Sequence, residues 1–132
     1  MLPHLILPDY DYYFWVDATH EVIQHPKTII TDYLKDGQIG VFNHSQRDCI
    51  YKEADAVKQV NYDNHELVNS QVAYYKKINY PINNGLYELP VSIRKNTPEI
   101  QLMNLRWWEQ ICKYSSRDQI SLPVVMWSLG IK

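Results

Sequence analysis

Residues Tyr12–Asp17 read YYFWVD, and they decide the first element of the fold. Four aromatic side chains and a valine follow one another without a polar residue, which predicts a strand buried on both faces. Asp17 stops this run, so its carboxylate is expected at the carboxyl end of the strand. A second strand is predicted at Ile39–Phe42 (IGVF), and the polar segment Asn43–Asp48 (NHSQRD) follows it. Polar side chains therefore gather at the ends of two predicted strands.

Most of the remaining chain is helical in pattern. Apolar residues recur at helical spacing in Pro26–Lys35, Ile50–Val60 and His65–Ile78, which predicts three amphipathic helices. A third strand is predicted at Leu86–Arg94, and Pro90 places it at an edge of the sheet or in a bulge.

Two more helices are predicted toward the C-terminus. Thr97 is expected to cap a helix that has Pro98 in its first turn. Ser116 and Gln119 have the spacing of a capping box, which predicts that the last helix begins there with Asp118 in its first turn.

The order of these elements predicts a single α/β domain, a small mixed sheet flanked by helices. A chain of 132 residues is long enough to bury one core. The polar segments after the strands predict a site along the carboxyl edge of the sheet.

Composition argues against several classes of protein. Thirteen basic and 15 acidic residues form no basic stripe, so a nucleic-acid partner is not expected. Neither glycine-rich phosphate loop occurs in a chain with four glycines. Two distant cysteines predict a reducing, cytoplasmic compartment, and no apolar run approaches the roughly 20 residues of a membrane helix. The sequence leaves a homo-oligomer open.

Aromatic side chains are abundant, with eleven tyrosines and four tryptophans. Such rings suit a core and also stack on sugars or bases, and core packing is the favoured interpretation.

Asp17 is the candidate metal ligand. A carboxylate at a strand end is placed to hold Mg²⁺ or Mn²⁺ together with substrate phosphates and water. The alternative is a turn aspartate that bonds its own backbone, because no second aspartate follows two residues on.

The second polar segment offers His44, Arg47 and Asp48. Arg47 can bind a phosphate or carboxylate through two hydrogen bonds, and His44 can bind a diphosphate or a metal. The alternative is a solvated loop. Glu53, on the next predicted helix, is expected at the surface.

Asp118 is the candidate catalytic residue. In a first helical turn the free backbone N–H groups and the helix dipole are expected to lower its pKa. Such an anion can accept hydrogen bonds from substrate hydroxyl groups or act as a general base. The alternative is an exposed pair with Arg117 that contributes little stability.

Four blocks of the sequence occur in the order found in a known family. The blocks are Tyr10–Ala18, Val41–Ala54, Gly85–Glu88 with Ile93–Pro98, and Trp107–Ile111 with Ser116–Ser121. Together they resemble the glycosyltransferase-like domain family of plant mucilage-related Golgi proteins and bacterial polysaccharide clusters. The resemblance covers nearly the whole chain.

This resemblance implies a truncated GT-A-like fold, that of nucleotide-diphospho-sugar transferases, and metal-assisted transfer of a hexose from a nucleotide-sugar donor to a glycan acceptor. Asp17 would take the place of the aspartate that binds the metal (Mn²⁺ or Mg²⁺) and the diphosphate, although the full DxD pattern is missing. Asp118 would hold the sugar or act as the base. The substrate-binding residues implied by the resemblance are His44, Arg47, Arg94, Trp107, Arg117 and Gln119.

Family members normally carry an upstream segment with the first strands of the nucleotide-binding half, whereas this sequence starts almost at the Asp17 strand. A minimal enzyme and an incomplete donor pocket are both compatible with that start. The alternative function is a non-catalytic carbohydrate- or nucleotide-binding module, and a hydrolase on the same scaffold is a third. The transferase hypothesis requires Asp17 and Asp118 to line a common crevice.

Overall fold

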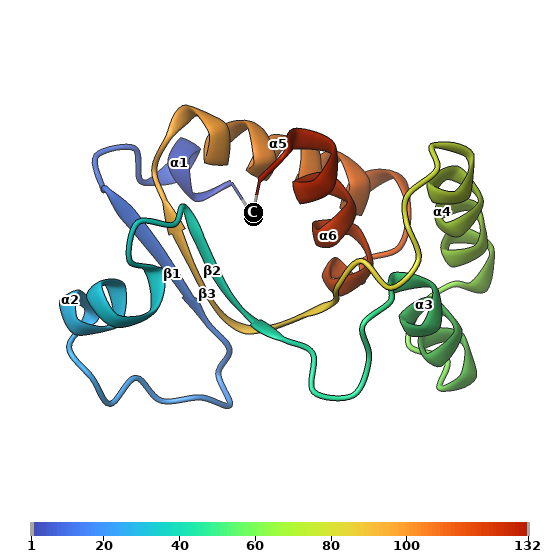
Figure 1. Cartoon of the computed structure of the whole chain (residues 1–132), viewed down its shortest axis with the longest axis horizontal. Coiled ribbons are helices and arrows are strands. Elements are labelled where there is room, and N and C mark those ends of the chain that lie inside the picture. Colours follow the sequence, from blue (N-terminus) through green and yellow to red (C-terminus); the bar gives the residue numbers. More distant parts are fainter. Residues whose placement is uncertain (1, 132) are drawn as a thin grey trace.

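The computed structural model describes residues 2–131 and contains helices on both sides of a small sheet (Figure 1). Its elements, in chain order, are α1 (Pro3–Ile6), β1 (Tyr12–Val16), α2 (Pro26–Ile29), the π-helical turn η1 (Ile30–Leu34), β2 (Ile39–Asn43), α3 (Ile50–Gln59), α4 (His65–Lys77), β3 (Tyr87–Lys95), α5 (Pro98–Lys113) and α6 (Asp118–Leu129). The α/β class predicted from the sequence is confirmed.

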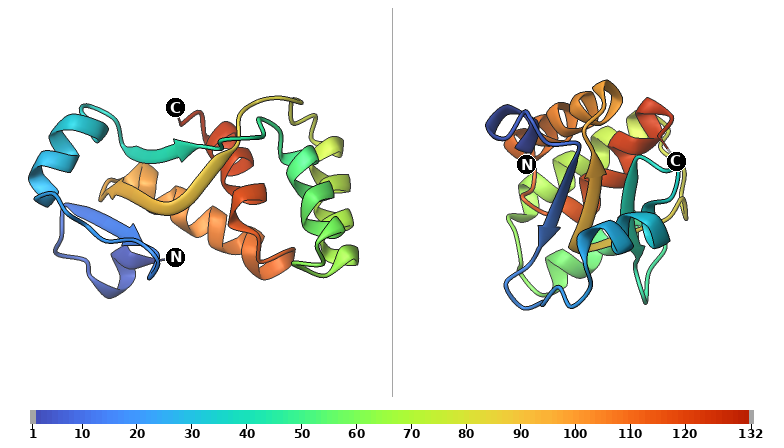
Figure 2. Two further views of the ribbon diagram at one scale, coloured as in Figure 1. Left: turned by 90° about the horizontal axis from the view of Figure 1, so that it is seen from below. Right: turned by 90° about the vertical axis from the view of Figure 1, so that its left-hand side faces the viewer.

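The sheet has the strand order β1-β3-β2, and both pairs are antiparallel. The right-hand view of Figure 2 shows β3 between the other two strands. The predicted mixed sheet is therefore wrong in its strand directions. Strand β1 is also not buried on both faces, because it is an edge strand in which only Tyr13 is buried.

Strand β3 contains the predicted irregularity around Pro90, but in the central strand and not at an edge. Gly40 pairs with Ile93 and Phe42 with Glu88, so the single β2 residue between Gly40 and Phe42 lies opposite four residues of β3. This bulge accommodates Pro90, which has no N–H for a sheet hydrogen bond. The Pro90 carbonyl instead accepts a hydrogen bond of 2.8 Å from the N–H of Asp17. The bulge thereby fixes the backbone of Asp17 at the end of β1.

Four layers follow one another along the longest axis of the molecule (Figure 1). Helix α2 and η1 lie on one side of the sheet, and α5 and α6 lie on the other, where α6 contacts β3. Helices α3 and α4 pack together at the far end, and α3 contacts α6. Helix α6 is therefore the central element between the sheet and the α3–α4 pair.

The apolar core has two parts, and α6 contributes to both. One part joins α6 to α3 and α4 through Ile50, Ala54, Val57, Val68, Tyr75, Tyr80, Leu86, Ile120 and Val124. The other joins α6 to α5 and β3 through Leu89, Ile100, Met103, Trp107, Leu122, Val125 and Met126. Because its side chains are buried on nearly every side, α6 has a fixed position, and so does the segment that leads into it.

The two predicted helix starts have different outcomes. Thr97 caps α5, and its hydroxyl oxygen accepts a hydrogen bond of 3.4 Å from the N–H of Ile100. The predicted capping box of α6 is wrong, because the N-cap residue is Arg117 and no side chain caps this helix. Asp118 is nevertheless in its first turn, as predicted.

Candidate functional site

A cavity of about 620 Å³ lies between the sheet and the beginning of α6. Both acids singled out in the sequence, Asp17 and Asp118, line it. The remaining lining residues are Trp15, Glu88, Leu89, Pro90, Ser92, Arg94, Trp107, Ser116, Arg117 and Gln119. The common crevice required by the transferase hypothesis is therefore present.

Strand pairing explains why the sheet presents these side chains to the cavity. Trp15 is paired with Ser92, and Tyr13 is paired with Arg94. Residues directly opposite each other in an antiparallel pair point to the same face. Trp15, Ser92 and Arg94 thus share the face that α5 and α6 cover, and Asp17 follows two residues after Trp15.

Asp118 differs from the expectation in its ionisation. Burial raises the pKa of its carboxyl, and the negative charge of Asp17 acts in the same direction. The N–H of Gln119, which donates to Asp118 Oδ1 over 2.9 Å, and the charge of Arg117 oppose this increase without overcoming it. The predicted lowering of the pKa by the helix terminus is therefore wrong, because removal of the carboxylate from water outweighs the helix terminus.

The segment before α6 is held by the turn between α3 and α4. The carboxylate of Asp63 accepts two hydrogen bonds of 2.7 Å from Ser116, one from its N–H and one from its hydroxyl. The Arg117 guanidinium lies 5.4 Å from the centre of the Tyr62 ring. The Tyr62–Asp63 turn thereby positions the residues that immediately precede Asp118.

A buried hydrogen-bond chain holds the same segment from the other side. The hydroxyl of Ser115 donates to Gln71 Oε1 over 2.7 Å, and Gln71 donates to the Tyr75 hydroxyl, which in turn donates to Gln110. Burial raises the pKa of Tyr75 above its ordinary value, so this hydroxyl stays protonated and remains a donor.

Two arginines bring positive charge to the cavity. Arg94 is buried, donates from Nη1 to Asn104 Oδ1 over 2.6 Å, and lies 5.7 Å from the centre of the Trp107 ring. Burial lowers the pKa of Arg94, but a guanidinium remains charged at neutral pH. Nε of Arg117 is buried and has no hydrogen-bond partner within residues 2–131. Both arginines thus line, together with the two carboxylates, a cavity large enough for a small ligand.

The two tryptophans in the cavity wall have opposite environments. Trp107, a predicted substrate-binding residue, is only 4% exposed, and its N–H donates to the Ser121 hydroxyl over 3.1 Å. Trp15, which was predicted to be buried, is 54% exposed, and its N–H donates to Asp17 Oδ1 over 2.8 Å. Trp107 therefore contributes to the core, whereas Trp15 remains accessible at the cavity.

His44 and Arg47 do not line this cavity. Arg47 Nε donates to Glu53 Oε2 over 2.6 Å, and Arg47 Nη2 lies 3.3 Å from His44 Nε2. Nδ1 of His44 accepts from the N–H groups of Gln46 and Arg47. Glu53 is 4% exposed, so its predicted surface position is wrong.

The Arg47 cluster, as we call His44, Arg47 and Glu53, adjoins the site through a second hollow. This smaller cavity of about 260 Å³ is lined by Arg47, Glu53, Tyr62 and several apolar residues. Arg117 and Gln119 line both cavities. The two hollows are therefore neighbours, separated by the first residues of α6 and its N-cap.

The carboxylates restrict how a metal ion can be held. Within residues 2–131, no three His, Cys, Asp or Glu side chains are grouped in a way that could hold one. Asp17 and Asp118 nevertheless line one cavity. Mg²⁺ is commonly bound by one or two carboxylates and completes its coordination with water and substrate phosphates. The side chains present fit an ion shared with a phosphate-bearing substrate, and not an ion enclosed by the protein alone.

Comparison with known proteins identifies the family. A family model described as the TOD1/MUCI70 glycosyltransferase-like domain matches residues 1–132. The chain belongs to this family. The probable hexosyltransferase MUCI70 of Arabidopsis thaliana is 26% identical over 142 aligned residues, an alignment that includes all of this chain. No solved structure matches the chain.

The chain spans 24% of the length of that relative. The TOD1/MUCI70 match therefore concerns a domain. The activity of the complete relative is not assigned to this chain by that match. None of the helices formed by residues 2–131 has the length and apolar character needed to cross a bilayer.

Sequence reasoning gave no site role to Trp15, Glu88 and Ser92, which belong to the cavity wall. Glu88 accepts hydrogen bonds from the N–H (3.0 Å) and the hydroxyl (2.8 Å) of Ser45, and these bonds lower the pKa of its carboxyl. Ser92 and Arg94 are two residues apart in a strand, so their side chains lie on the same face of the sheet. Only the pairing of β3 with β1 identifies that face as the one toward the cavity.

Proposed function

We propose that this domain is a hexosyltransferase domain of GT-A-like type that binds a nucleotide-diphospho-sugar donor and a glycan acceptor in the Asp17–Asp118 cavity. The observation that carries the proposal is that Asp17 and Asp118 line one cavity together with Arg94 and Arg117. Membership of a glycosyltransferase-like family supports this reaction class.

Asp118 is the proposed base. Its carboxyl is partly buried at the start of a fixed helix, and its raised pKa brings it closer to neutral pH, where proton abstraction is most efficient. An ionised Asp118 would accept the proton of the acceptor hydroxyl as that oxygen attacks the sugar. The hydrogen bonds that Ser116 donates to Asp63 keep the residues before Asp118 in place during this step.

Arg94 and Arg117 are the proposed partners of the donor diphosphate. Guanidinium groups stabilise the negative charge that develops on a leaving diphosphate. Arg117 lines the cavity, and its buried Nε has no hydrogen-bond partner within residues 2–131. Gln119 would bind sugar hydroxyl groups from the same helix start.

Asp17 is the proposed ligand of a divalent ion, Mn²⁺ or Mg²⁺. When bound with the donor, such an ion would neutralise the charge of the leaving diphosphate. The hydrogen bonds from Trp15 Nε1 and from the backbone of Asp17 to Pro90 hold this carboxylate at the cavity.

The test is release of free nucleotide from a panel of UDP- and GDP-sugars, with and without Mn²⁺ and with a mixed glycan acceptor. We expect the wild type to release nucleotide. Asp17→Asn and Asp118→Asn should each abolish this release, although their circular dichroism spectra should match that of the wild type. Asp48→Asn is the matched control, because Asp48 is exposed and does not line the cavity.

Sugar binding without nucleotide release in any arm would instead favour the alternative function, a non-catalytic carbohydrate- or nucleotide-binding module. Equal release by the wild type and by both aspartate variants would reject the proposed site.

A further inference from the structure

We propose that Trp15 is the surface on which a pyranose ring stacks when a sugar occupies the Asp17–Asp118 cavity. The proposal rests on the proposed function in that it concerns the same cavity, and it adds a residue and the chemistry of its ligand. Neither the family resemblance nor the sequence pattern assigned a role to this side chain.

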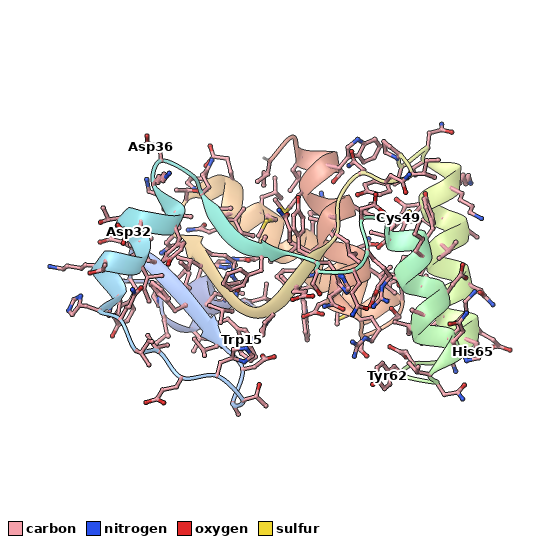
Figure 3. The ribbon with its side chains drawn as sticks, turned by 60° about the horizontal axis from the view of Figure 1, so that its bottom comes forward. Trp15, Asp32, Asp36, Cys49, Tyr62 and His65 are labelled. Atoms are coloured by element: carbon pink, nitrogen blue, oxygen red, sulfur yellow. The ribbon has the colours of Figure 1, made fainter. Side chains whose placement is uncertain are left out.

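The surroundings of Trp15 leave its ring accessible. Its cross-strand partner is Ser92, whose small side chain cannot cover an indole. Trp15 is 54% exposed although it belongs to the cavity wall. Figure 3 shows Trp15 near the end of β1. An exposed aromatic ring at a concave polar site is a surface that a ligand can cover.

A hydrogen bond fixes the orientation of this ring. Nε1 of Trp15 donates to Asp17 Oδ1 over 2.8 Å, which ties the edge of the indole to the carboxylate. Because the edge is engaged, the face of the ring is the part that remains for contact. A ring held in this way loses little side-chain entropy when a ligand binds.

The groups around Trp15 favour a sugar over a nucleotide base. A pyranose has apolar C–H groups on its faces and hydroxyl groups around its edge. The hydroxyl groups can donate to the carboxylates of Asp17 and Asp118 while a face of the sugar packs on the indole. A uracil ring has a single N–H donor between two carbonyl acceptors, so its edge offers the carboxylates fewer donors than the hydroxyl groups of a sugar do.

Within residues 2–131, no other tryptophan combines an exposed side chain with a place in the cavity wall. Trp107 lines the cavity but is buried, and its face is next to the guanidinium of Arg94. Trp108 is 42% exposed but does not line the cavity. Trp108 is therefore a matched control of similar exposure.

The experiment uses the backbone and indole N–H signals of ¹⁵N-labelled protein. The protein is titrated with methyl β-D-glucopyranoside, with methyl β-D-galactopyranoside and, separately, with uridine. Trp15→Phe assigns the Trp15 indole signal, because that signal disappears. We expect at least one hexoside to shift the Trp15 signal more than the other three indole signals.

Three variants then measure the contribution of the ring. Trp15→Ala is expected to weaken hexoside binding by roughly tenfold or more, because the stacking area is removed. Trp15→Phe retains an aromatic face and should weaken binding less. Trp108→Ala should bind as the wild type does, and thermal unfolding checks that all variants are folded.

Several results would overturn the proposal. They are an unchanged hexoside Kd in Trp15→Ala, no response of the Trp15 signal to either hexoside, or a response to uridine alone. Its failure is distinguishable from failure of the proposed function. If Trp15→Ala loses hexoside binding and the wild type releases no nucleotide, the stacking surface is supported and the transferase is rejected. If nucleotide release depends on Asp17 and Asp118 but not on Trp15, the transferase is supported and the stacking surface is rejected.

Discussion

The Asp17–Asp118 cavity and the Arg47 cluster are two polar regions at the same edge of one sheet, and they use their charges differently. In the Arg47 cluster the charges are matched within the protein, with Arg47 bonded to a buried Glu53 over 2.6 Å. In the cavity, two carboxylates lie near each other, and burial and like charge raise the pKa of Asp118. Glu53 has its cation within the protein, whereas Asp118 keeps a raised pKa at a cavity despite the nearby Arg117, and perturbed carboxyls of this kind are typical of functional sites.

The largest expected effect is that of Asp118→Asn. We expect turnover in the nucleotide-release assay to fall at least about a hundredfold, because a general base is removed. The same change should increase stability at neutral pH. A raised folded-state pKa means that the ionised carboxylate favours the unfolded chain, and Asn removes this cost.

Urea unfolding between pH 4 and pH 8 checks the second part. The stability advantage of Asp118→Asn should shrink as the pH falls, because the wild-type carboxyl becomes protonated in the folded state first. If Asp118→Asn is less stable than the wild type at every pH in this range, the ionised Asp118 carboxylate stabilises the folded state and the prediction is wrong.

The second effect concerns the Arg47 cluster. Arg47→Met should lower the free energy of unfolding by about 2–3 kcal/mol, because it leaves the buried Glu53 carboxylate without its cation. Urea unfolding measures the loss. Adding Glu53→Leu to Arg47→Met should recover much of it, since both charges are then absent. If Arg47→Met loses donor binding and keeps its stability, the Arg47 cluster is a ligand-binding region like the cavity, and the proposed difference between the two regions is wrong.

The third effect is that of Asp63→Asn, which disturbs the segment before the cavity. Asp63 Oδ2 accepts both bonds from Ser116, and Oδ1 accepts one from the N–H of Asn64. An amide has only one oxygen and cannot keep all three bonds, so we expect a cost of about 1 kcal/mol. Burial acts to raise the pKa of Asp63, but hydrogen bonds from Ser116 and Asn64 outweigh it and lower that pKa.

A lowered folded-state pKa gives Asp63 a pH signature. Its contribution is present above the unfolded value of 3.8 and is lost as the pH falls through the folded value. The difference in unfolding free energy between the wild type and Asp63→Asn should therefore narrow below that range. A constant difference across pH would mean that the carboxylate charge has no part in holding Ser116.

The smallest effect is that of Lys52→Ala. Lys52 pairs with Asp48 over 3.0 Å, but both side chains are well exposed. An exposed pair of this kind adds little to stability, so the urea midpoint should not change measurably. Lys52→Ala is the surface counterpart of Arg47→Met. A comparable loss of stability in both variants would show that burial does not make the Arg47–Glu53 pair more important for stability than the Lys52–Asp48 pair.

Local signals explain what could be predicted from the sequence. The bounds of α3, α4 and α5 agree with apolar periodicity and with the Thr97 cap, since both depend on residues close in sequence. Asp17 and Asp118 were recognised as a strand end and a first helical turn, which are also local features. Their common cavity followed from the expected layering of a sheet and helices.

Tertiary contacts explain what could not be predicted. The central place of β3 depends on pairing with strands far away in sequence, which the pattern around Pro90 does not encode. Glu53 is buried because Arg47 closes over it, and the pKa of Asp118 is raised because neighbouring elements exclude water. Trp15 is exposed because β1 is an edge strand, a fact that an apolar run cannot reveal.

The pairing of β1 with β3 also has a consequence for biosynthesis. Val16 pairs with Val91, and at the usual rate of translation the interval between them takes roughly 4 to 15 seconds. During that interval the aromatic run of β1 has no strand beside it, which makes the nascent chain a natural client for chaperones. Asp118 is translated later still, so the two acids can meet only after the whole segment between them has been synthesised.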